Sequence, residues 1–187
     1  WAVITQGGVQ VDKLGKRFWN EAQGYSEAAR VVLAQPDGEA FAIFDEDIAS
    51  VARQFTDFQN AEKQGAIKTG GTIAELANQL GLPAAELKKT LSAIPVDGTD
   101  QFGRAFSDTN LKPPFKGVKV TGALFHTQGG LCVDKLARVQ KLDGAPFPNL
   151  FAAGGAAVGV SGSNDSGYLS GNGLLSAVVL GRIAGQA

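Results

Sequence analysis

A glycine-dense segment near the C-terminus constrains the fold of this chain more than any other feature of its sequence. The apolar residues 150–153, Leu-Phe-Ala-Ala, predict a short buried strand, and Gly154 and Gly155 follow it directly. The residues up to Gly173 are rich in Gly, Ser and Asn, and residues 174–187 predict a helix. Four side chains of this helix are expected to be buried: Leu175, Val178, Val179 and Ile183. Because glycine has no Cβ, a strand that ends in glycines lets another group approach its backbone closely.

The beginning of this C-terminal helix is a candidate binding site. A helix that begins at Gly171 or Asn172 directs free N–H groups and a partial positive charge at whatever lies before it. Suitable partners are a phosphate group or a flavin ring, whose reduced form carries negative charge. A plain surface loop that leads into a helix produces the same pattern, so the residues alone leave both interpretations open.

Composition argues against several classes of protein. The net charge is −1 and no basic stripe is present, so neither nucleic acid nor an acidic membrane surface is expected as a partner. The chain has one cysteine, Cys132, and one histidine, His126, which excludes a disulfide within the chain and a Cys- or His-rich metal site. No apolar run reaches the length of a membrane span. We expect a cytoplasmic protein and Cys132 as an inert core residue.

Local signals in the first half of the chain predict mixed secondary structure. Thr72 and Glu75 have the spacing of a capping box, and Gly81 follows the apolar residues of the helix that they begin. A second helix is predicted to begin at Pro83. The other expected elements are a strand pair or bulged strand over 2–11, a helix over 26–33, a strand over 39–44 and a helix over 45–55.

The pattern changes after the second of these helices. Residues 95–114 are polar and contain Pro and Gly, which indicates a domain boundary. Strands are expected over 118–124 and 131–133, and Asp143-Gly144 predicts a hairpin turn. The chain therefore favours two parts of different character.

Several segments together resemble one enzyme family. The run from His126 to Leu131, His-Thr-Gln-Gly-Gly-Leu, the run Pro148-Asn-Leu-Phe-Ala-Ala-Gly154, and the glycines between Gly171 and Gly185 are similar to the C-terminal pattern of FAD-dependent fumarate reductase/succinate dehydrogenase flavoproteins. Near the N-terminus, Gly15-Lys-Arg-Phe and Asn20-Glu21 resemble the segment that leads into the capping domain of that family.

The resemblance implies a domain assignment. Residues 1–10 would be the tail of the first part of the FAD-binding domain, 11–115 an α+β capping domain, and 116–187 the C-terminal half of the FAD-binding domain. The α/β FAD-binding domain would lack its N-terminal Rossmann-like half, because no GxGxxG motif opens a helix after a strand. We therefore expect a fragment that binds FAD weakly or not at all by itself. Its expected partners are a small-molecule substrate and either the missing half or a second copy.

The resemblance also implies roles for individual residues. His126 matches a flavin contact, and Phe125 and Gly171 match substrate contacts. Tyr168 and Glu21 are the candidate catalytic residues. The remaining expected cofactor contacts are Gly154, Gly155, Asn172, Gly173 and Leu174. Gly155 stands where relatives usually have a Glu that holds the ribityl chain, so this chain can offer only backbone there.

The departures from the family pattern bear on the substrate. Dicarboxylate reductases have His at Phe125, Arg at Tyr168 and a proton-donating Arg near Ala49. A dicarboxylate needs fixed cations to pair with its two charges, so fumarate and succinate are poor candidates. Tyr168 could instead act as a general acid or base, or donate a hydrogen bond to a carbonyl.

Three functions remain open at this point. The resemblance implies a dehydrogenase or ene-reductase that transfers a hydride between a substrate carbon and flavin N5. One alternative is a cofactor-free fragment or subunit that binds a partner chain carrying the dinucleotide unit. Another is a flavoprotein-derived module with no redox role. Purely structural roles also remain open for four residues: His126 at a strand end, Tyr168 in the pocket wall, Glu21 in a surface pair with Lys16 or Arg17, and Arg104 in a salt bridge that anchors the cap.

Overall fold

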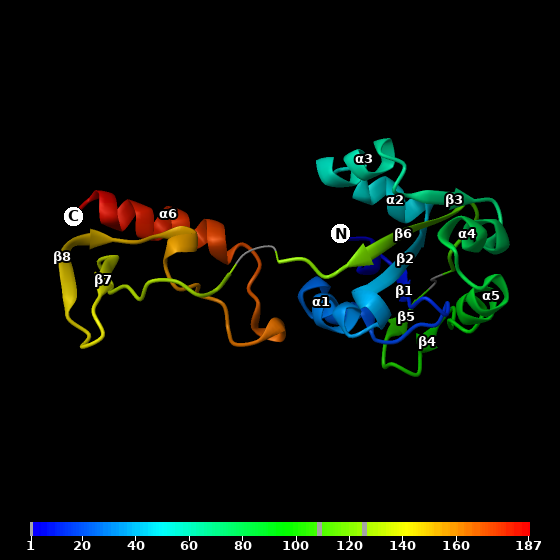
Figure 1. Ribbon diagram of the computed structural model, residues 1–187, viewed down its shortest axis with the longest axis horizontal. Helices are drawn as coiled ribbons and strands as arrows, with labels where there is room; N and C mark the ends of the chain where they lie inside the picture. The colour runs from blue at the N-terminus through cyan, green and yellow to red at the C-terminus, as the bar shows by residue number, and fades with distance from the viewer. Residues whose placement is uncertain (1, 108–109, 125–126) are drawn as a thin grey trace. The chain divides into compact units, whose positions relative to one another are not determined.

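The computed structural model describes residues 2–107, 110–124 and 127–187 (Figure 1). The chain divides into two compact units, Trp1–Gly122 (unit 1) and Ala123–Ala187 (unit 2). Each has its own secondary structure and its own buried apolar cluster. The mixture of helices and sheets agrees with the sequence-based expectation. None of the helices in the described residues combines the length and apolar character needed to span a membrane.

Unit 1 is built on a four-stranded antiparallel sheet in the order β1-β2-β6-β3. The strands are β1 (Val9–Val11), β2 (Glu39–Asp45), β6 (Phe115–Thr121) and β3 (Lys68–Gly70). Central β2 pairs with β1 through Val11↔Phe41 and with β6 through Ile43↔Gly117. The predicted domain boundary at residue 116 falls within this sheet, because β6 pairs with β2 and β3.

The two faces of β2 contribute to two separate cores. Ala42 and Phe44 belong to a cluster that also contains Trp19 and Phe58, whereas Phe41 and Ile43 belong to a second cluster. Successive side chains of a strand point to opposite faces, so β2 can be buried on both sides only if both faces are covered. This explains why β2 is apolar throughout most of its length rather than alternating with polar residues.

Helices cover both faces of the sheet in unit 1 (Figure 1). The first cluster includes residues of α1 (Tyr25–Leu33), α2 (Glu46–Ala52) and α3 (Thr56–Lys63). The second includes residues of α4 (Ile73–Leu80) and α5 (Ala84–Ser92). The expected helices over 26–33 and 45–55 are confirmed in type, with Asp45 as the N-cap of α2.

The predicted start and end of α4 are confirmed in atomic detail. The Thr72 side chain accepts a hydrogen bond from the Glu75 backbone N–H at 3.2 Å, and the Glu75 carboxylate accepts one from Gly71 N–H at 2.8 Å. Gly81 ends the helix in the left-handed conformation at φ 71°. As predicted, α5 begins directly after Pro83.

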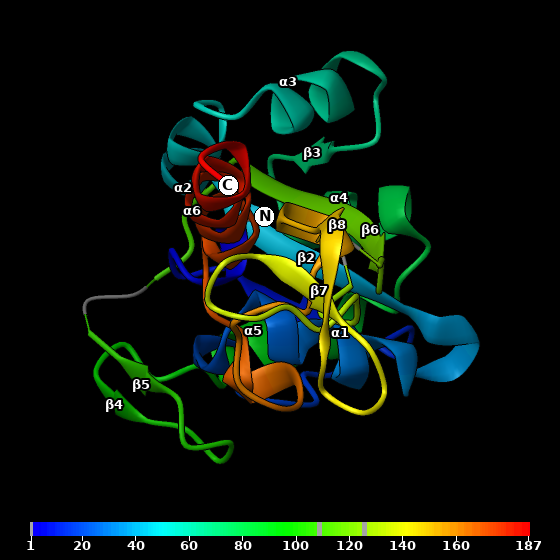
Figure 2. The same cartoon turned by 90° about the vertical axis from the view of Figure 1, so that its left-hand side faces the viewer.

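The remaining short elements of unit 1 include one correction. They are η1 (Ala2–Ile4), η2 (Glu21–Gln23), η3 (Pro36–Gly38), β4 (Gly98–Thr99) and β5 (Ala105–Phe106), where η denotes a 3₁₀ helix. Figure 2 shows the β4–β5 hairpin from the side. The strand pair or bulged strand predicted over residues 2–11 is wrong in its first half, where η1 precedes β1. Gly8 N–H donates to Val3 O at 2.9 Å and closes this turn.

Unit 2 contains a short hairpin, a glycine-rich loop and one helix. Strands β7 (Arg138–Gln140) and β8 (Pro146–Phe151) are antiparallel, and the predicted turn at Asp143-Gly144 joins them. Gly144 has φ 84°, and the Asp143 carboxylate accepts from Ala145 N–H at 2.9 Å. The loop contains η4 (Gly154–Ala156) and η5 (Asp165–Gly167) and leads to α6 (Asn172–Gly185).

Burial in unit 2 differs from the sequence-based expectation. Three predicted core residues of α6 are 46–69% exposed: Leu175, Val178 and Val179. Ile183 is half-buried, β8 is mostly exposed, and Cys132 is exposed rather than in the core. The reason is the small size of the apolar cluster in unit 2, which has Val139, Ala152 and Ala157 as its buried residues.

Candidate functional site

The glycine-rich loop of unit 2 packs against the helix that follows it. Gly154 has φ 57°, and a Cβ added to it would lie 3.1 Å from Ala177 Cβ on α6. A larger residue at Gly154 would therefore be strained by its backbone conformation and would crowd the helix. This close contact fixes the end of the segment after β8 beside the first turns of α6.

The N-terminus of α6 has no side-chain cap. Its N-cap residue Gly171 is in the left-handed conformation at φ 81°, and the helix begins when Leu175 N–H donates to Gly171 O at 2.9 Å. The first N–H groups of an α-helix have no partner within the helix. The amides of Gly173 and Leu174 are thus placed to donate to a ligand, with the partial positive charge of the helix end behind them.

Asn172 has a different role from its neighbours. Its side chain is 2% exposed, and its Nδ2 donates to Leu169 O at 2.9 Å. The amide group therefore holds the loop that precedes α6. Any contact between Asn172 and a cofactor would involve its backbone rather than this buried side chain.

Open space surrounds the other predicted contacts in this loop. A Cβ added to Gly155, Gly171 or Gly173 would meet no heavy atom within 4 Å, and Leu174 is 78% exposed. Gly154 packs η4 against α6. Gly155 in η4 and Gly173 in α6 therefore belong to the same local structure. Exposed backbone, unpaired helix N–H groups and an adjacent apolar side chain fit the polar edge and the flat face of a flavin.

Tyr168 lies between η5 and α6. It is half-buried, and its backbone N–H donates to Asp165 O at 3.3 Å. The Leu169 backbone N–H donates to Ser161 Oγ at 3.0 Å, which fixes the chain beside Tyr168. The structure thus brings Tyr168 onto the segment that leads into Gly171. Phe125 and His126 lie outside the described residues.

In unit 1, Glu21 is the centre of a buried ion-pair network. Its side chain is 0% exposed. Arg17 donates to both carboxylate oxygens, at 3.0 and 2.5 Å, and Arg104 donates to Oε2 at 2.9 Å. The Gln10 backbone N–H donates to Oε1 at 2.8 Å. Of the two partners weighed from sequence, Arg17 is correct, but the pair is buried rather than on the surface.

Asp100 completes the network from the β4–β5 hairpin. Its carboxylate accepts from Arg17 at 2.5 Å and from the backbone N–H groups of Phe102 and Arg104 at 2.9 and 2.8 Å. Burial would raise the pKa of the Asp100 carboxyl, but the hydrogen bonds from Arg104, Arg17 and Phe102 bring this pKa below its ordinary value. The network therefore balances two guanidinium groups with two carboxylates.

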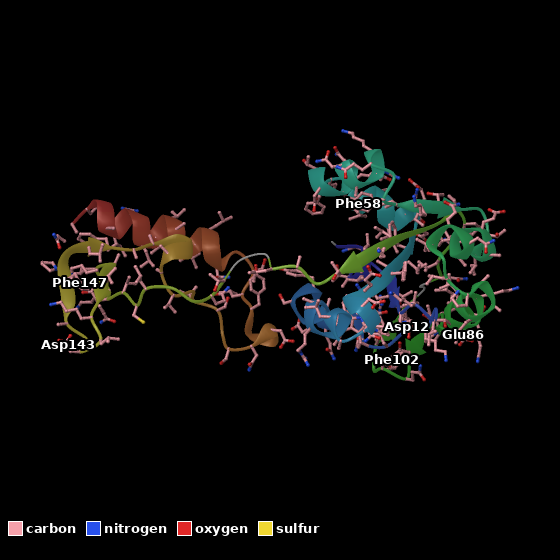
Figure 3. All side chains as sticks on the ribbon, in the orientation of Figure 1. Asp12, Phe58, Glu86, Phe102, Asp143 and Phe147 are labelled. Carbon is pink, nitrogen blue, oxygen red and sulfur yellow. The ribbon has the colours of Figure 1, made fainter. Side chains whose placement is uncertain are left out.

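Aromatic rings surround the two arginines. The Arg17 guanidinium lies 5.3 Å from the centroid of Phe102, and Arg104 lies 4.6 Å from that of Phe106. Figure 3 labels Phe102 among the side chains of unit 1. Arg104 also donates to Gly8 O at 2.9 Å and to Ile4 O at 3.3 Å. The structure therefore shows Arg104 in a salt bridge with Glu21.

This geometry favours a structural role for Glu21. A carboxylate that already accepts from two guanidinium groups and one amide, without exposure to solvent, is not accessible to a substrate in this structure. Sequence reasoning did not identify Asp100. The opposite charges on either side of Gly103, in Asp100-Gln-Phe-Gly-Arg104, are the signal that could have found it.

The position expected for a proton-donating arginine is apolar. Ala49 is 0% exposed and belongs to the same buried cluster as Phe44 and Phe58. No charged group can therefore be offered to a substrate by this side chain.

Comparisons with known proteins show what the chain is similar to. A family model described as an FAD binding domain matches residues 2–174. The chain is 36% identical over 185 residues to a probable fumarate reductase of Shewanella frigidimarina, covering 96% of this chain and 30% of that protein. It is 32% identical over 192 residues to NADH:acrylate oxidoreductase of Vibrio harveyi, covering 99% of this chain and 19% of that protein.

Solved structures show the same relationship. The open conformation of a flavocytochrome c3 fumarate reductase is 33% identical, with a TM-score of 0.74, and the match covers 98% of this chain and 32% of that chain. A 3-ketosteroid-Δ4-(5α)-dehydrogenase from Rhodococcus jostii is 25% identical, with a TM-score of 0.59, covering 98% and 38%. The chain thus spans between 19% and 38% of the length of these relatives.

Replacing Glu21 tests its structural role. The substitution Glu21→Gln keeps the shape of the side chain but leaves two buried guanidinium groups opposite one carboxylate. We expect the free energy of unfolding to fall by about 3–5 kcal/mol, as measured by urea denaturation at neutral pH. The control Glu86→Gln removes a carboxylate whose ion pair with Lys89 is 4.0 Å long, and should change stability by less than about 0.5 kcal/mol. Equal stability of the two variants would contradict this role.

The Asp100 carboxyl should make the stability of unit 1 depend on pH. Its pKa is lower in the folded chain, so it stabilises the fold above its unfolded pKa of about 4, and this contribution is lost as pH falls through the folded pKa. The difference in unfolding free energy between the unmodified chain and Asp100→Asn should therefore be largest near about pH 7 and shrink below about pH 4. Urea denaturation across this range measures it, and a difference independent of pH would exclude the assignment.

Proposed function

The chain belongs to the FAD binding domain family, and on this premise we propose that it forms part of an FAD-dependent oxidoreductase. Unit 2 would correspond to the C-terminal half of the FAD-binding domain, and most of unit 1 to the capping domain. The reaction would be that of a dehydrogenase or ene-reductase. FAD, when bound, supplies the redox chemistry by exchanging a hydride between its N5 atom and a substrate carbon.

The observation that carries this proposal is the uncapped N-terminus of α6 beside open glycines. The amides of Gly173 and Leu174 would stabilise negative charge on the polar edge of the cofactor. Gly155 would let the cofactor contact backbone, because no side chain occupies the space around it. The exposed Leu174 side chain would contribute apolar surface for a flat ring.

Tyr168 is the proposed catalytic residue for proton transfer. Its position on the segment before α6 places it in the same unit as the proposed flavin contacts. A phenol can donate a proton or hydrogen-bond a carbonyl oxygen without carrying a charge. Glu21, in contrast, would position the β4–β5 hairpin through Arg104.

The proposed substrate is a carbonyl or monocarboxylate compound rather than a dicarboxylate. Fumarate has two carboxylates, acrylate has one, and a 3-ketosteroid has a ketone, so the named relatives span all three classes. Recognition of two carboxylates requires fixed cations. The apolar burial of Ala49 and the phenol of Tyr168 support the second and third classes.

The exposed apolar surface of α6 supports a second candidate function. Leu174, Leu175 and Val178 are 78%, 54% and 69% exposed. Contiguous exposed apolar side chains commonly mark a protein–protein contact. A cofactor-free chain that binds a partner carrying the dinucleotide unit, or a second copy of itself, would cover them.

A glycine substitution separates the two candidates. The source polypeptide that contains this chain should show flavin absorption, and Gly173→Val should lower its flavin affinity by at least about 10-fold, because a side chain would occupy the cofactor's space. Gly181→Val is the matched control, since Gly181 lies on the same helix and a Cβ there also meets nothing within 4 Å. Both variants should keep the helical circular dichroism. Absence of flavin from the unmodified source polypeptide, even after FAD is added, would favour the cofactor-free alternative.

Replacing Tyr168 tests the proposed proton transfer. In the flavin-loaded protein, Tyr168→Phe should lower turnover of an unsaturated ketone or monocarboxylate by about 10²-fold or more, with flavin content unchanged. Turnover would be measured with a reduced dye as electron source. Tyr25→Phe, at the second tyrosine of the chain, is the control. Unchanged turnover in Tyr168→Phe would remove this residue from the mechanism.

A further inference from the structure

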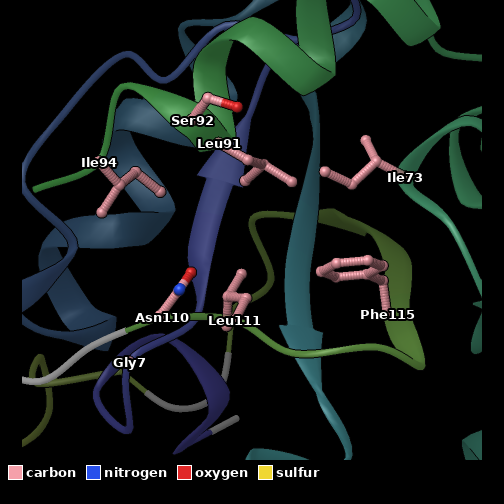
Figure 4. A pocket seen from close by; sticks show the side chains of 8 residues that line it. All are labelled: Gly7, Ile73, Leu91, Ser92, Ile94, Asn110, Leu111 and Phe115. Atoms are coloured by element: carbon pink, nitrogen blue, oxygen red, sulfur yellow. The ribbon is translucent and has the colours of Figure 1, made fainter. Parts of the chain in front are cut away.

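Unit 1 contains a cavity that neither its fold nor the proposed flavin chemistry uses. It has a volume of about 180 Å³ and lies between α4, α5 and the start of β6 (Figure 4). Its walls are formed by five apolar side chains: Ile73, Leu91, Ile94, Leu111 and Phe115. All five are only partly buried at the border of the second apolar cluster, so the cavity is an unfilled part of that core.

The chemistry of the lining excludes a charged occupant. Besides the apolar walls, the cavity is bordered by the Ser92 hydroxyl and the Asn110 amide, and none of the lining residues that the structure describes carries a charge. An ion placed there would lose hydration without gaining a counter-charge. A neutral molecule would lose little, and one polar group on it could hydrogen-bond to Ser92 or Asn110.

The volume indicates the size of the occupant. A dry apolar cavity of about 150 Å³ in another protein binds benzene. A cavity of about 180 Å³ is therefore large enough for a six-membered ring with a small substituent. Filling it would place carbon atoms against side chains that now lack neighbours on one side, which strengthens dispersion contacts.

We propose that this cavity binds a neutral, ring-sized organic molecule with at most one hydrogen-bonding group. The site is formed by residues of unit 1 alone and does not depend on the flavin. It would make unit 1 responsive to small apolar metabolites, because an occupant bridges the α4–α5 helix pair and β6.

Methyl NMR of the complete chain tests binding directly. Benzene and phenol are the neutral probes, and benzoate is the charged probe of similar size. We expect saturable shifts of the Ile73 and Leu91 methyl signals with benzene and phenol, and at least about 10-fold weaker binding of benzoate. The Ile48 methyl signal, from the opposite core of unit 1, should not move. Absent shifts, equal shifts at Ile48, or equal binding of benzoate would each overturn the proposal.

Variants locate the bound molecule. Leu91→Phe should fill the cavity and abolish the benzene-induced shift at Ile73, and Ile94→Phe should act in the same way. Leu33→Phe, at a residue 57% exposed and away from the cavity lining, should leave benzene binding intact. Asn110→Leu should weaken phenol binding by about 2- to 10-fold while benzene binding is kept. Benzene binding that persists in both cavity-filling variants, each folded by circular dichroism, would show that the molecule binds elsewhere.

Discussion

The carboxylate of Glu21 is the interaction on which the arrangement of unit 1 depends. It lies between two guanidinium groups, and a buried charge is costly unless it is paired and hydrogen-bonded. Arg104 reaches this carboxylate from the β4–β5 hairpin and also donates to Ile4 O and Gly8 O. Arg17 joins Glu21 to Asp100 on the same hairpin. The N-terminal segment and the hairpin are therefore held by one neutral group of four charges. Removing any one of them leaves an uncompensated charge, which explains why a residue with the appearance of a catalytic acid has a structural role.

The two units obtain their order in different ways. In unit 1, both faces of β2 are covered by helices, so apolar burial and the charge network act together. In unit 2, the buried apolar cluster consists of Val139, Ala152 and Ala157. Close backbone contacts therefore contribute more to holding its segments in place. Gly154 packs on Ala177, and the buried Asn172 amide holds the preceding loop. These contacts fix the N-terminus of α6 while leaving its first amides and neighbouring glycines open. A surface of this kind is suited to a cofactor, because the backbone that would contact it is already positioned.

Short-range signals could be predicted from sequence, whereas long-range ones could not. Thr72, Gly81 and Asp143-Gly144 act within a few residues, and the structure confirms the elements they predict. The Glu21–Arg104 pair joins residues 83 positions apart, and no local sequence pattern predicts such a contact. Burial along α6 was predicted wrongly. An apolar pattern shows that a side chain favours burial, but it does not show which part of the protein covers that side chain. The roles of Phe125 and His126 stay predictions, since these residues lie outside the described part of the chain.

The apolar character at Ala49 is a property of the surrounding core of unit 1 rather than of this residue alone. Ala49 lies at 0% exposure in the cluster that contains Phe44 and Phe58. A guanidinium in its place would need both space and a counter-charge within an apolar cluster that offers neither. The surrounding packing is therefore adapted to a small side chain. An arginine at this position would therefore require this part of the core of unit 1 to be repacked.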